Sequence, residues 1–363
     1  MAIIPQQRLF QWQEIEQMQD LERLRLALEH MPDEVLMKRL EKERANGRDD
    51  YPVRAVWNCI VAGIVYQHAS VESLRRELLR NAQLRWVCGI NGAVPPSWVF
   101  SRFMKRLMKM KDEVEALFER LTEALAREMP DLGERLAMDG KAICSHGKPA
   151  KKGAAADGRR ETDADWGAKT YRGVRADGTA WEKTEWCFGF KLHLVVDADY
   201  ELPVAYSVSR ASEAEAPQAH KMLEKMEQRQ PWLLERCETL LADKGYDDGK
   251  LLKRLWDEHE IKPVIDIRDA WKDGETTRLL AGRDNVVYDC RGNVYCHCPV
   301  TGKRLSMAYG GFEKRRNALK YRCPARHYGA QCKGAGECAS FHGIRIPLDT
   351  DRRIFVPIAR SSY

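Results

Sequence analysis

The chain has 363 residues, of which 44% are hydrophobic and 31% charged, and its formal net charge is +6. This composition excludes a disordered chain and predicts a globular protein. The most apolar stretch, residues 53–66, contains Arg54 and is shorter than the roughly 18 apolar residues of a membrane span, so no membrane contact is expected.

The N-terminal residues show no positive segment ahead of an apolar core, so we expect no signal peptide and a cytoplasmic protein. Reducing conditions there disfavour disulfides. The eleven cysteines therefore need another explanation.

Residues up to about 130 are predicted to be helical, because apolar residues such as Met18, Leu21, Leu24 and Leu28 recur at helical spacing. Within this part, Ser97 is a candidate N-cap for a helix over residues 98–110.

The helix over residues 98–110 is basic and follows a shorter helix over residues 71–79. Such a pair suggests a helix-turn-helix-like element that binds DNA, and a plain solvated face is the alternative. Its candidate DNA-binding residues are Arg102, Lys105, Arg106 and Lys109.

After Asp139 the pattern changes to that of a mixed α/β sheet flanked by helices. Residues 144–178 are predicted to form a long basic loop. The expected elements then follow as strands 188–197 and 202–209 in a hairpin, helix 212–229, strand 239–243, a helix around 251–256 and strand 262–267.

Asp139 and Asp243 each end a short apolar run, where a carboxylate packs poorly but can hold a hard cation such as Mg²⁺. Two such carboxylates on neighbouring strands are part of a two-metal phosphoryl-transfer site. The alternative is that each is a turn residue at a strand end.

Two blocks of six basic residues each, within 141–160 and 314–326, suit a polyanion such as nucleic acid. Solvated basic loops are the alternative. From residue 271 the helical pattern fades into short strands.

Six cysteines fall within 49 residues of this last part: Cys290, Cys296, Cys298, Cys323, Cys332 and Cys338. Structural zinc takes four Cys or His ligands, and few large apolar residues are available here to build a core. The spacings are not those of a standard finger or ribbon, so reduced, partly buried thiols are the alternative.

Three strings resemble motifs of the DDE transposases of bacterial insertion sequences. They are Asp139-Gly140-Lys141, Gly189-Phe190-Lys191-Leu192-His193 and Ala242-Asp243-Lys244-Gly245-Tyr246-Asp247. The resemblance spans roughly residues 48–363, and residues 51–109 are similar to the family's N-terminal transposase domain. It implies an RNase H-like catalytic domain whose first two catalytic aspartates, Asp139 and Asp243, hold Mg²⁺ or Mn²⁺.

The resemblance also implies cleavage of element ends and transfer of the exposed 3′-OH to target DNA. The expected partner is double-stranded DNA, both the terminal repeats and the target, bound by a homodimer. Expected phosphate contacts are Lys141, Lys191, His193 and Lys244, with surface lysines and a packed histidine as the alternative.

The family's third carboxylate is a glutamate on a helix after the last strand, and no such helix is predicted. Glu313 and Glu337 are nearby but lie in the cysteine-rich stretch. We therefore expect a truncated, frameshifted or fragmentary chain with little cleavage of its own. The alternatives are an inactive, DNA-binding regulatory remnant and, less well supported, a zinc hydrolase.

These patterns divide the chain into four parts. We expect a helical DNA-binding domain over 1–130 and an RNase H-like core over 131–270. A cysteine-rich insertion with a possible zinc site over 271–345 and a final strand over 346–363 would then leave the core incomplete.

Overall fold

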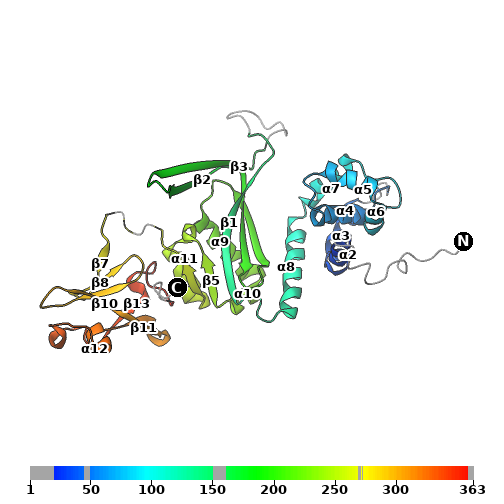
Figure 1. The fold of residues 1–363 in the computed structure, drawn as a ribbon. Coiled ribbons are helices and arrows are strands. Elements are labelled where there is room, and N and C mark those ends of the chain that lie inside the picture. The colour runs from blue at the N-terminus through cyan, green and yellow to red at the C-terminus, as the bar shows by residue number, and fades with distance from the viewer. Residues whose placement is uncertain (1–19, 45–49, 150–160, 269–270, 272, 359–363) are drawn as a thin grey trace. The chain divides into compact units, whose positions relative to one another are not determined.

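The computed structural model describes residues 20–44, 50–149, 161–268, 271 and 273–358. They belong to two compact units, Met1–Glu128 and Met129–Tyr363, and each unit is described by itself (Figure 1). Three sequence-based expectations lie partly or wholly outside the described residues. They concern the N-terminal segment with Met18, most of the basic block within 141–160, and the end of the expected final strand.

Unit 1 is helical, as predicted. Its helices are α2 (Asp20–His30), α3 (Glu34–Arg44), α4 (Val53–Val65), α5 (Val71–Arg80), α6 (Ala82–Val87), α7 (Ser97–Leu107) and α8 (Lys111–Glu128). The apolar helix α4 contacts α2, α3, α5 and α7, and Leu36, Leu78 and Phe100 are fully buried around it. The basic helix begins at Ser97 with Pro96 as its N-cap, so the prediction that the Ser97 side chain caps it is wrong.

Unit 2 contains the predicted mixed sheet. Its strands are β1 (Arg135–Cys144), β2 (Asp165–Val174), β3 (Ala180–Asp197), β4 (Pro203–Arg210), β5 (Thr239–Ala242) and β6 (Lys262–Ile265). The order is β2-β3-β1-β5-β6, with β4 also paired to β3. Strand β1 is antiparallel to β3 and parallel to β5, and β5 is parallel to β6. The helices of this part are α9 (Glu215–Arg229), α10 (Pro231–Arg236), α11 (Gly249–His259) and the short η2 (Lys244–Tyr246).

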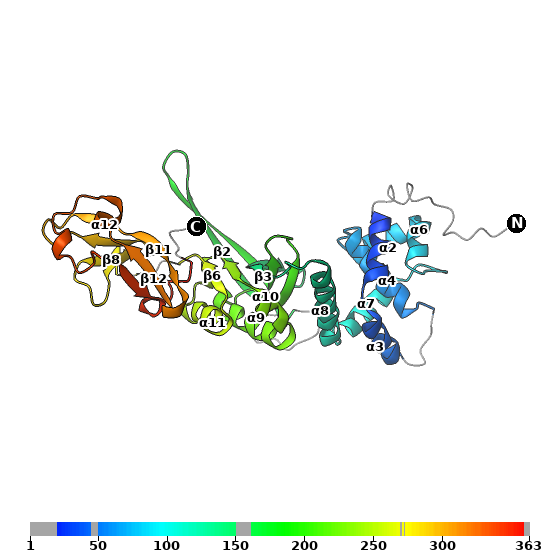
Figure 2. The ribbon, with the colours of Figure 1, turned by 90° about the horizontal axis from the view of Figure 1, so that it is seen from below.

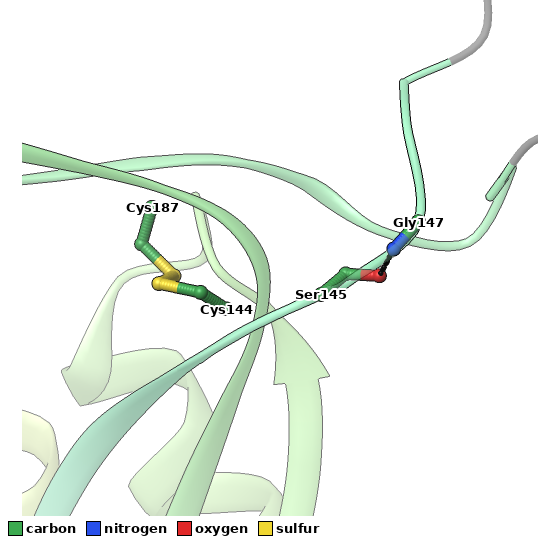
Figure 3. The surroundings of a disulfide bond; sticks show 4 residues. All are labelled: Cys144, Ser145, Gly147 and Cys187. Atoms are coloured by element: carbon green, nitrogen blue, oxygen red, sulfur yellow. Dashed lines mark hydrogen bonds between the residues drawn. A yellow bond between two sulfur atoms is a disulfide. The ribbon is translucent and has the colours of Figure 1, made fainter.

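Strand β2 lies in the stretch that was expected to be a loop. It pairs with the first half of β3, and this two-stranded ribbon projects beyond the sheet in both views (Figures 1 and 2). At the base of the ribbon a disulfide joins Cys144 of β1 to Cys187 of β3, with their Cα atoms 5.2 Å apart (Figure 3). The expectation that disulfides are disfavoured is therefore wrong for this pair, which the antiparallel pairing of β1 and β3 brings together.

The cysteine-rich part forms two small sheets. One contains β7 (Thr277–Leu279), β8 (Val286–Asp289), β9 (Val294–His297) and β10 (Arg304–Ser306). The other contains β11 (Ala308–Glu313), β12 (Ala318–Arg322) and β13 (Ile344–Pro347), followed by the turn η5 (Leu348–Thr350). The cysteine-rich part also contains the turns η3 (Lys314–Arg316) and η4 (Ala335–Glu337) and the short helix α12 (Pro324–Tyr328).

This part has an apolar core of its own, which the sequence argument did not expect. Trp256 of α11, Val286, Leu319 and Phe355 are among its buried members. Within the expected final strand over 346–363, the apolar residues 353–358 form a turn followed by irregular chain, and Ile354 and Phe355 fill this core. In the described parts of the chain, no helix is long and apolar enough to cross a membrane.

Candidate active site

Three aspartates occupy equivalent positions on three neighbouring strands. Met138 of β1 pairs with Ala242 of β5, and Ala242 pairs with Ile265 of β6. The next residue on each strand is Asp139, Asp243 and Asp266, respectively. Because neighbouring strands lie about 4.8 Å apart, the three carboxylates converge on one edge of the sheet.

Asp139 was expected at a strand end, but it lies within β1, which continues to Cys144 alongside β3. Asp243 and Asp266 do follow the last residues of β5 and β6. The three positions still coincide, because Asp139 lies one residue beyond the last pair that β1 makes with β5.

The three aspartates line an open hollow of about 370 Å³. Side chains alternate between the faces of a strand, so residues two before each aspartate share its face. Those residues are Ala137, Leu241 and Val264, which also line the hollow. The site is therefore an apolar floor bordered by exposed carboxylates.

Local hydrogen bonds fix one oxygen of two of these carboxylates. The backbone N–H of Gly140 donates to Asp139 Oδ1 at 2.7 Å, and that of Gly245 donates to Asp243 Oδ1 at 2.8 Å. Among the described residues no hydrogen bond reaches either Oδ2 atom. One oxygen of each carboxylate is thus held by the chain and the other is available to a ligand.

A buried pair supports the sheet from its opposite face. Tyr246 is fully buried and its hydroxyl lies 3.5 Å from His193 Nδ1, while His193 Nε2 lies 2.9 Å from Ser209 Oγ. Burial lowers the pKa of His193 to about 4 and raises that of Tyr246, so both are neutral near pH 7. A Cβ added to Gly140 would lie 3.3 Å from the Tyr246 hydroxyl, so Tyr246 packs directly beneath the strand at Asp139.

Gly245 admits a second acidic side chain close to Asp243. A Cβ at Gly245 would lie 1.8 Å from Glu215 Oε2, which shows that this carboxylate occupies the space above the glycine. Glu215 begins α9 and forms an ion pair with Lys191 at 3.4 Å. Lys191 also donates to the carbonyl of Glu213 at 3.1 Å.

The expected phosphate contacts separate into two groups. Lys141 and Lys244 are exposed, and Lys141 lies two residues after Asp139 on the same face of β1. Lys191 and His193 pair with residues of the opposite face and turn toward α9. His193 is 1% exposed, so the phosphate role is wrong for His193 and the packed histidine is correct.

The basic residues predicted to bind DNA lie on α7 and just after it. Arg102, Lys105 and Lys109 are exposed, whereas Arg106 is half-buried. The Arg102 guanidinium stacks over the exposed ring of Trp98, 4.7 Å from its centroid. This helix therefore presents cations and an aromatic ring together.

Five of the six clustered cysteines are gathered in one region. Burial raises the pKa of Cys296 to about 11, and Cys323, Cys338 and Cys332 lie close enough to add to that shift. Burial, followed by the neighbouring Cys298, raises the pKa of Cys332. Cys290 is exposed at the turn between β8 and β9, at the opposite end of the hairpin from Cys298.

Asp266 was missed by the sequence argument, although it shows the same signal as the other two aspartates. The apolar run Pro263-Val264-Ile265 precedes it directly. The predicted strand extended to residue 267, which placed Asp266 inside a strand instead of after one. Glu313 was considered as the third carboxylate and rejected. It lies in β11 and forms an ion pair with Arg345 of β13, in a different sheet from the three aspartates.

Comparison with protein families agrees with these features. Residues 133–299 match the transposase DDE domain, and residues 10–106 match a transposase domain of the DUF772 type. No curated protein matches the chain. The first match contains all three aspartates of the hollow, and its fold is RNase H-like. The chain belongs to the DDE transposases, as the resemblance implied.

Proposed function

We propose that unit 2 binds divalent cations, Mg²⁺ or Mn²⁺, through Asp139, Asp243 and Asp266 and performs DNA strand cleavage and strand transfer there. The observation that carries the proposal is the common register of the three carboxylates around one hollow. Oxygen donors at this spacing fit a hard cation, and an oxygen of Asp139 and of Asp243 is available for it.

When bound, two such ions supply an activated water and stabilise the leaving 3′-oxygen. The chain itself positions the DNA phosphate. Lys141 and Lys244 flank the two aspartates in sequence and are exposed, so their ammonium groups can hold the backbone without reading its sequence.

We further propose that α7 of unit 1 contacts double-stranded DNA at the element ends. From residue 97 to 111 there are five basic residues and no acidic one. Cations on one exposed helix face, next to Trp98, suit phosphate contacts and stacking. Two ends must be joined, so a homodimer on DNA is part of this proposal.

Among the described residues the lining of the hollow includes no glutamate, and Asp266 is its third carboxylate. Weak cleavage by these 363 residues alone stays a prediction. A DNA-binding regulatory role is the second candidate, because the exposed basic face of α7 does not depend on the carboxylates.

Binding of Mn²⁺, measured by its paramagnetic resonance signal, tests the metal site. The wild-type protein should bind Mn²⁺, whereas Asp139→Asn and Asp243→Asn should weaken binding strongly. Asp131→Asn, an exposed aspartate before β1, serves as the control. Equal Mn²⁺ binding by all four proteins would refute the metal site, and nicking of plasmid DNA by the same set would separate catalysis from DNA binding alone.

A further inference from the structure

The ribbon of β2 and the first half of β3 leaves one long strand edge without a partner. Strand β2 pairs with β3 over its whole length, and within the described parts of the chain no strand pairs with its other edge. The ribbon extends beyond the body of the sheet, so this edge is open along ten residues (Figures 1 and 2). Unpaired backbone groups on such an edge form a template for another strand.

The hairpin turn shows which residues of β2 direct their backbone groups toward the open edge. The Arg175 N–H donates to the Thr179 carbonyl at 2.9 Å, so Arg175 faces the second strand of the ribbon. Backbone groups alternate in direction along a strand, so those of the even-numbered residues from 166 to 174 point away from β3. The Trp166 N–H accordingly donates to the side chain of Asp165, at 2.7 Å. Thr170 is the middle residue of this outward set.

One face of the ribbon carries exposed apolar side chains. Trp166 is 50% exposed, and its ring lies 5.4 Å from that of Phe188 between centroids. Trp186 and Val174, on the same face, are exposed by 66% and 70%. Residues 165–188 include four basic and four acidic residues, so the ribbon has no net charge. An apolar, uncharged surface suits a protein partner better than the phosphates of DNA.

We propose that the open edge of β2 pairs antiparallel with the same edge of a second copy of this chain, with Thr170 opposite Thr170 on the two-fold axis. The inference rests on the homodimer of the proposed function and assigns its contact surface. In this register the residues that face each other across the axis are Asp165 and Arg175, Trp166 and Val174, Gly167 and Gly173, Ala168 and Arg172, and Lys169 and Tyr171. The exposed Trp166 thus meets the exposed Val174 of the second copy.

Charge complementarity selects this register over its neighbours. Asp165 lies opposite Arg175 of the second copy, and Arg175 forms no ion pair among the described residues. A slip of two residues in either direction keeps the same backbone groups facing each other but brings like charges together. One slip sets Lys169 opposite Lys169, and the other sets Asp165 opposite Asp177. The sequence of β2 is therefore self-complementary about Thr170.

Antiparallel pairing also leaves room for the rest of both chains. The two sheets lie at opposite ends of a four-stranded ribbon, separated by about 30 Å for a strand of ten residues. Ala168, Thr170 and Arg172 exchange about six backbone hydrogen bonds with the second copy. Gly167 and Gly173 lie opposite each other, so no bulky side chain crowds that pair.

Sedimentation of the full chain without DNA tests the pairing, with Thr170→Pro as the test variant and Thr184→Pro as its matched control. Thr184 lies directly opposite Thr170 within the ribbon and their hydroxyls hydrogen bond at 3.0 Å, so both variants lose that contact. Neither proline removes a hydrogen bond between β2 and β3, because both N–H groups point outward. The wild type and Thr184→Pro should be dimers. The dimer dissociation constant of Thr170→Pro should be at least about 30-fold higher, since two hydrogen bonds are lost. A wild type that is monomeric at about 100 μM, or a Thr170→Pro that dimerises as the wild type does, overturns the inference.

Cross-linking through one introduced cysteine keeps the test independent of the proline variants. Hydrogen-bonded residues of an antiparallel pair have Cα atoms about 5.5 Å apart, which suits a disulfide. Under mild oxidation Thr170→Cys should form a covalent dimer through residue 170, identified by peptide mass mapping, whereas Thr184→Cys should not link through residue 184. Absence of the link in Thr170→Cys, or equal linking of both variants, overturns the register.

Mn²⁺ titration of the same proteins separates this inference from the proposed metal site. The Thr170→Pro variant should bind Mn²⁺ as the wild type does, because β2 supplies none of the three aspartates. A wild type that binds Mn²⁺ but stays monomeric overturns the pairing alone. A wild type that dimerises but does not bind Mn²⁺ overturns the metal site alone.

Discussion

Replacement of Asp266 by asparagine tests the register of the proposed metal site most directly. The change keeps the shape of the side chain and removes its charge. Asp266 lies beside Asp243 at the equivalent position of the next parallel strand, and it is exposed. We expect it to stabilise a cation held by the other two carboxylates, through one direct bond or through its charge alone.

The size of the effect follows from the strand spacing. A unit charge about 5 Å from a divalent ion contributes about 2 kcal/mol at the dielectric constant of water and about 7 kcal/mol at an effective value of 20. Because the hollow is open and Asp266 is exposed, the lower figure applies. The dissociation constant for Mn²⁺ should therefore rise about 30-fold.

The assay is Mn²⁺ titration at low and moderate ionic strength. Asp266→Asn should bind more weakly than wild type by the stated factor, and Asp139→Asn and Asp243→Asn should be affected at least as strongly. Asp131→Asn should leave the affinity unchanged. If Asp266→Asn binds Mn²⁺ with an affinity within twofold of wild type, Asp266 does not act on the ion held by Asp139 and Asp243, although all three occupy equivalent strand positions.

Three further predictions concern the surroundings of the site. Gly245→Ala forces Glu215 out of the space it occupies, so the free energy of unfolding should fall by about 1 kcal/mol and Mn²⁺ binding should weaken several-fold. Asp247→Asn removes the fully buried partner of Arg353, which lies 2.5 Å away, and should cost about 3 kcal/mol in urea unfolding. His193 has a pKa lowered to about 4 against 6.5 in the unfolded chain. The contribution of neutral His193 to the free energy of unfolding is therefore complete above pH 6.5 and is lost as the pH falls toward 4. The loss between pH 7 and pH 5 amounts to about 2 kcal/mol.

Matched variants separate these effects from general damage. Gly336→Ala meets no atom within 4 Å and should not change stability or Mn²⁺ affinity. Asp349→Asn removes an exposed partner of Arg352 and should cost less than about 0.5 kcal/mol. His193→Gln should abolish the part of the pH dependence assigned to this histidine. If Gly336→Ala has the same effect as Gly245→Ala, or Asp349→Asn the same effect as Asp247→Asn, the contact removed in the test variant is not the cause of the lost stability.

The sheet and its two predicted aspartates could be derived from the sequence because both depend on local patterns. Apolar runs predict buried strands, and an aspartate after such a run predicts a polar edge. Asp266 was missed only because the end of β6 was placed two residues too late, and strand ends are the least certain part of such a prediction. Local patterns thus predicted the kind of site but not its full membership.

Other errors have a nonlocal cause. Both faces of the β2–β3 ribbon carry charged and polar side chains, so β2 lacks the alternation that marks a half-buried strand. Lys191 and His193 were correctly placed on one face, but the sequence does not tell which face α9 covers. The apolar residues 354–356 predicted a strand, whereas packing against a second sheet buries them without any strand pairing.

The string Asp243-Lys244-Gly245-Tyr246-Asp247 shows why a short motif can identify a family more reliably than its catalytic residues alone. Only the first residue faces the hollow. Gly245 leaves room for Glu215, Tyr246 lies buried beneath Gly140, and Asp247 accepts hydrogen bonds from Arg353 and from the backbone of Arg268. These four contacts with distant segments fall on three of the five consecutive residues, so the motif records how the strand end is held in place. A lone aspartate after an apolar run, such as Asp266, lacks those constraints and is correspondingly harder to recognise.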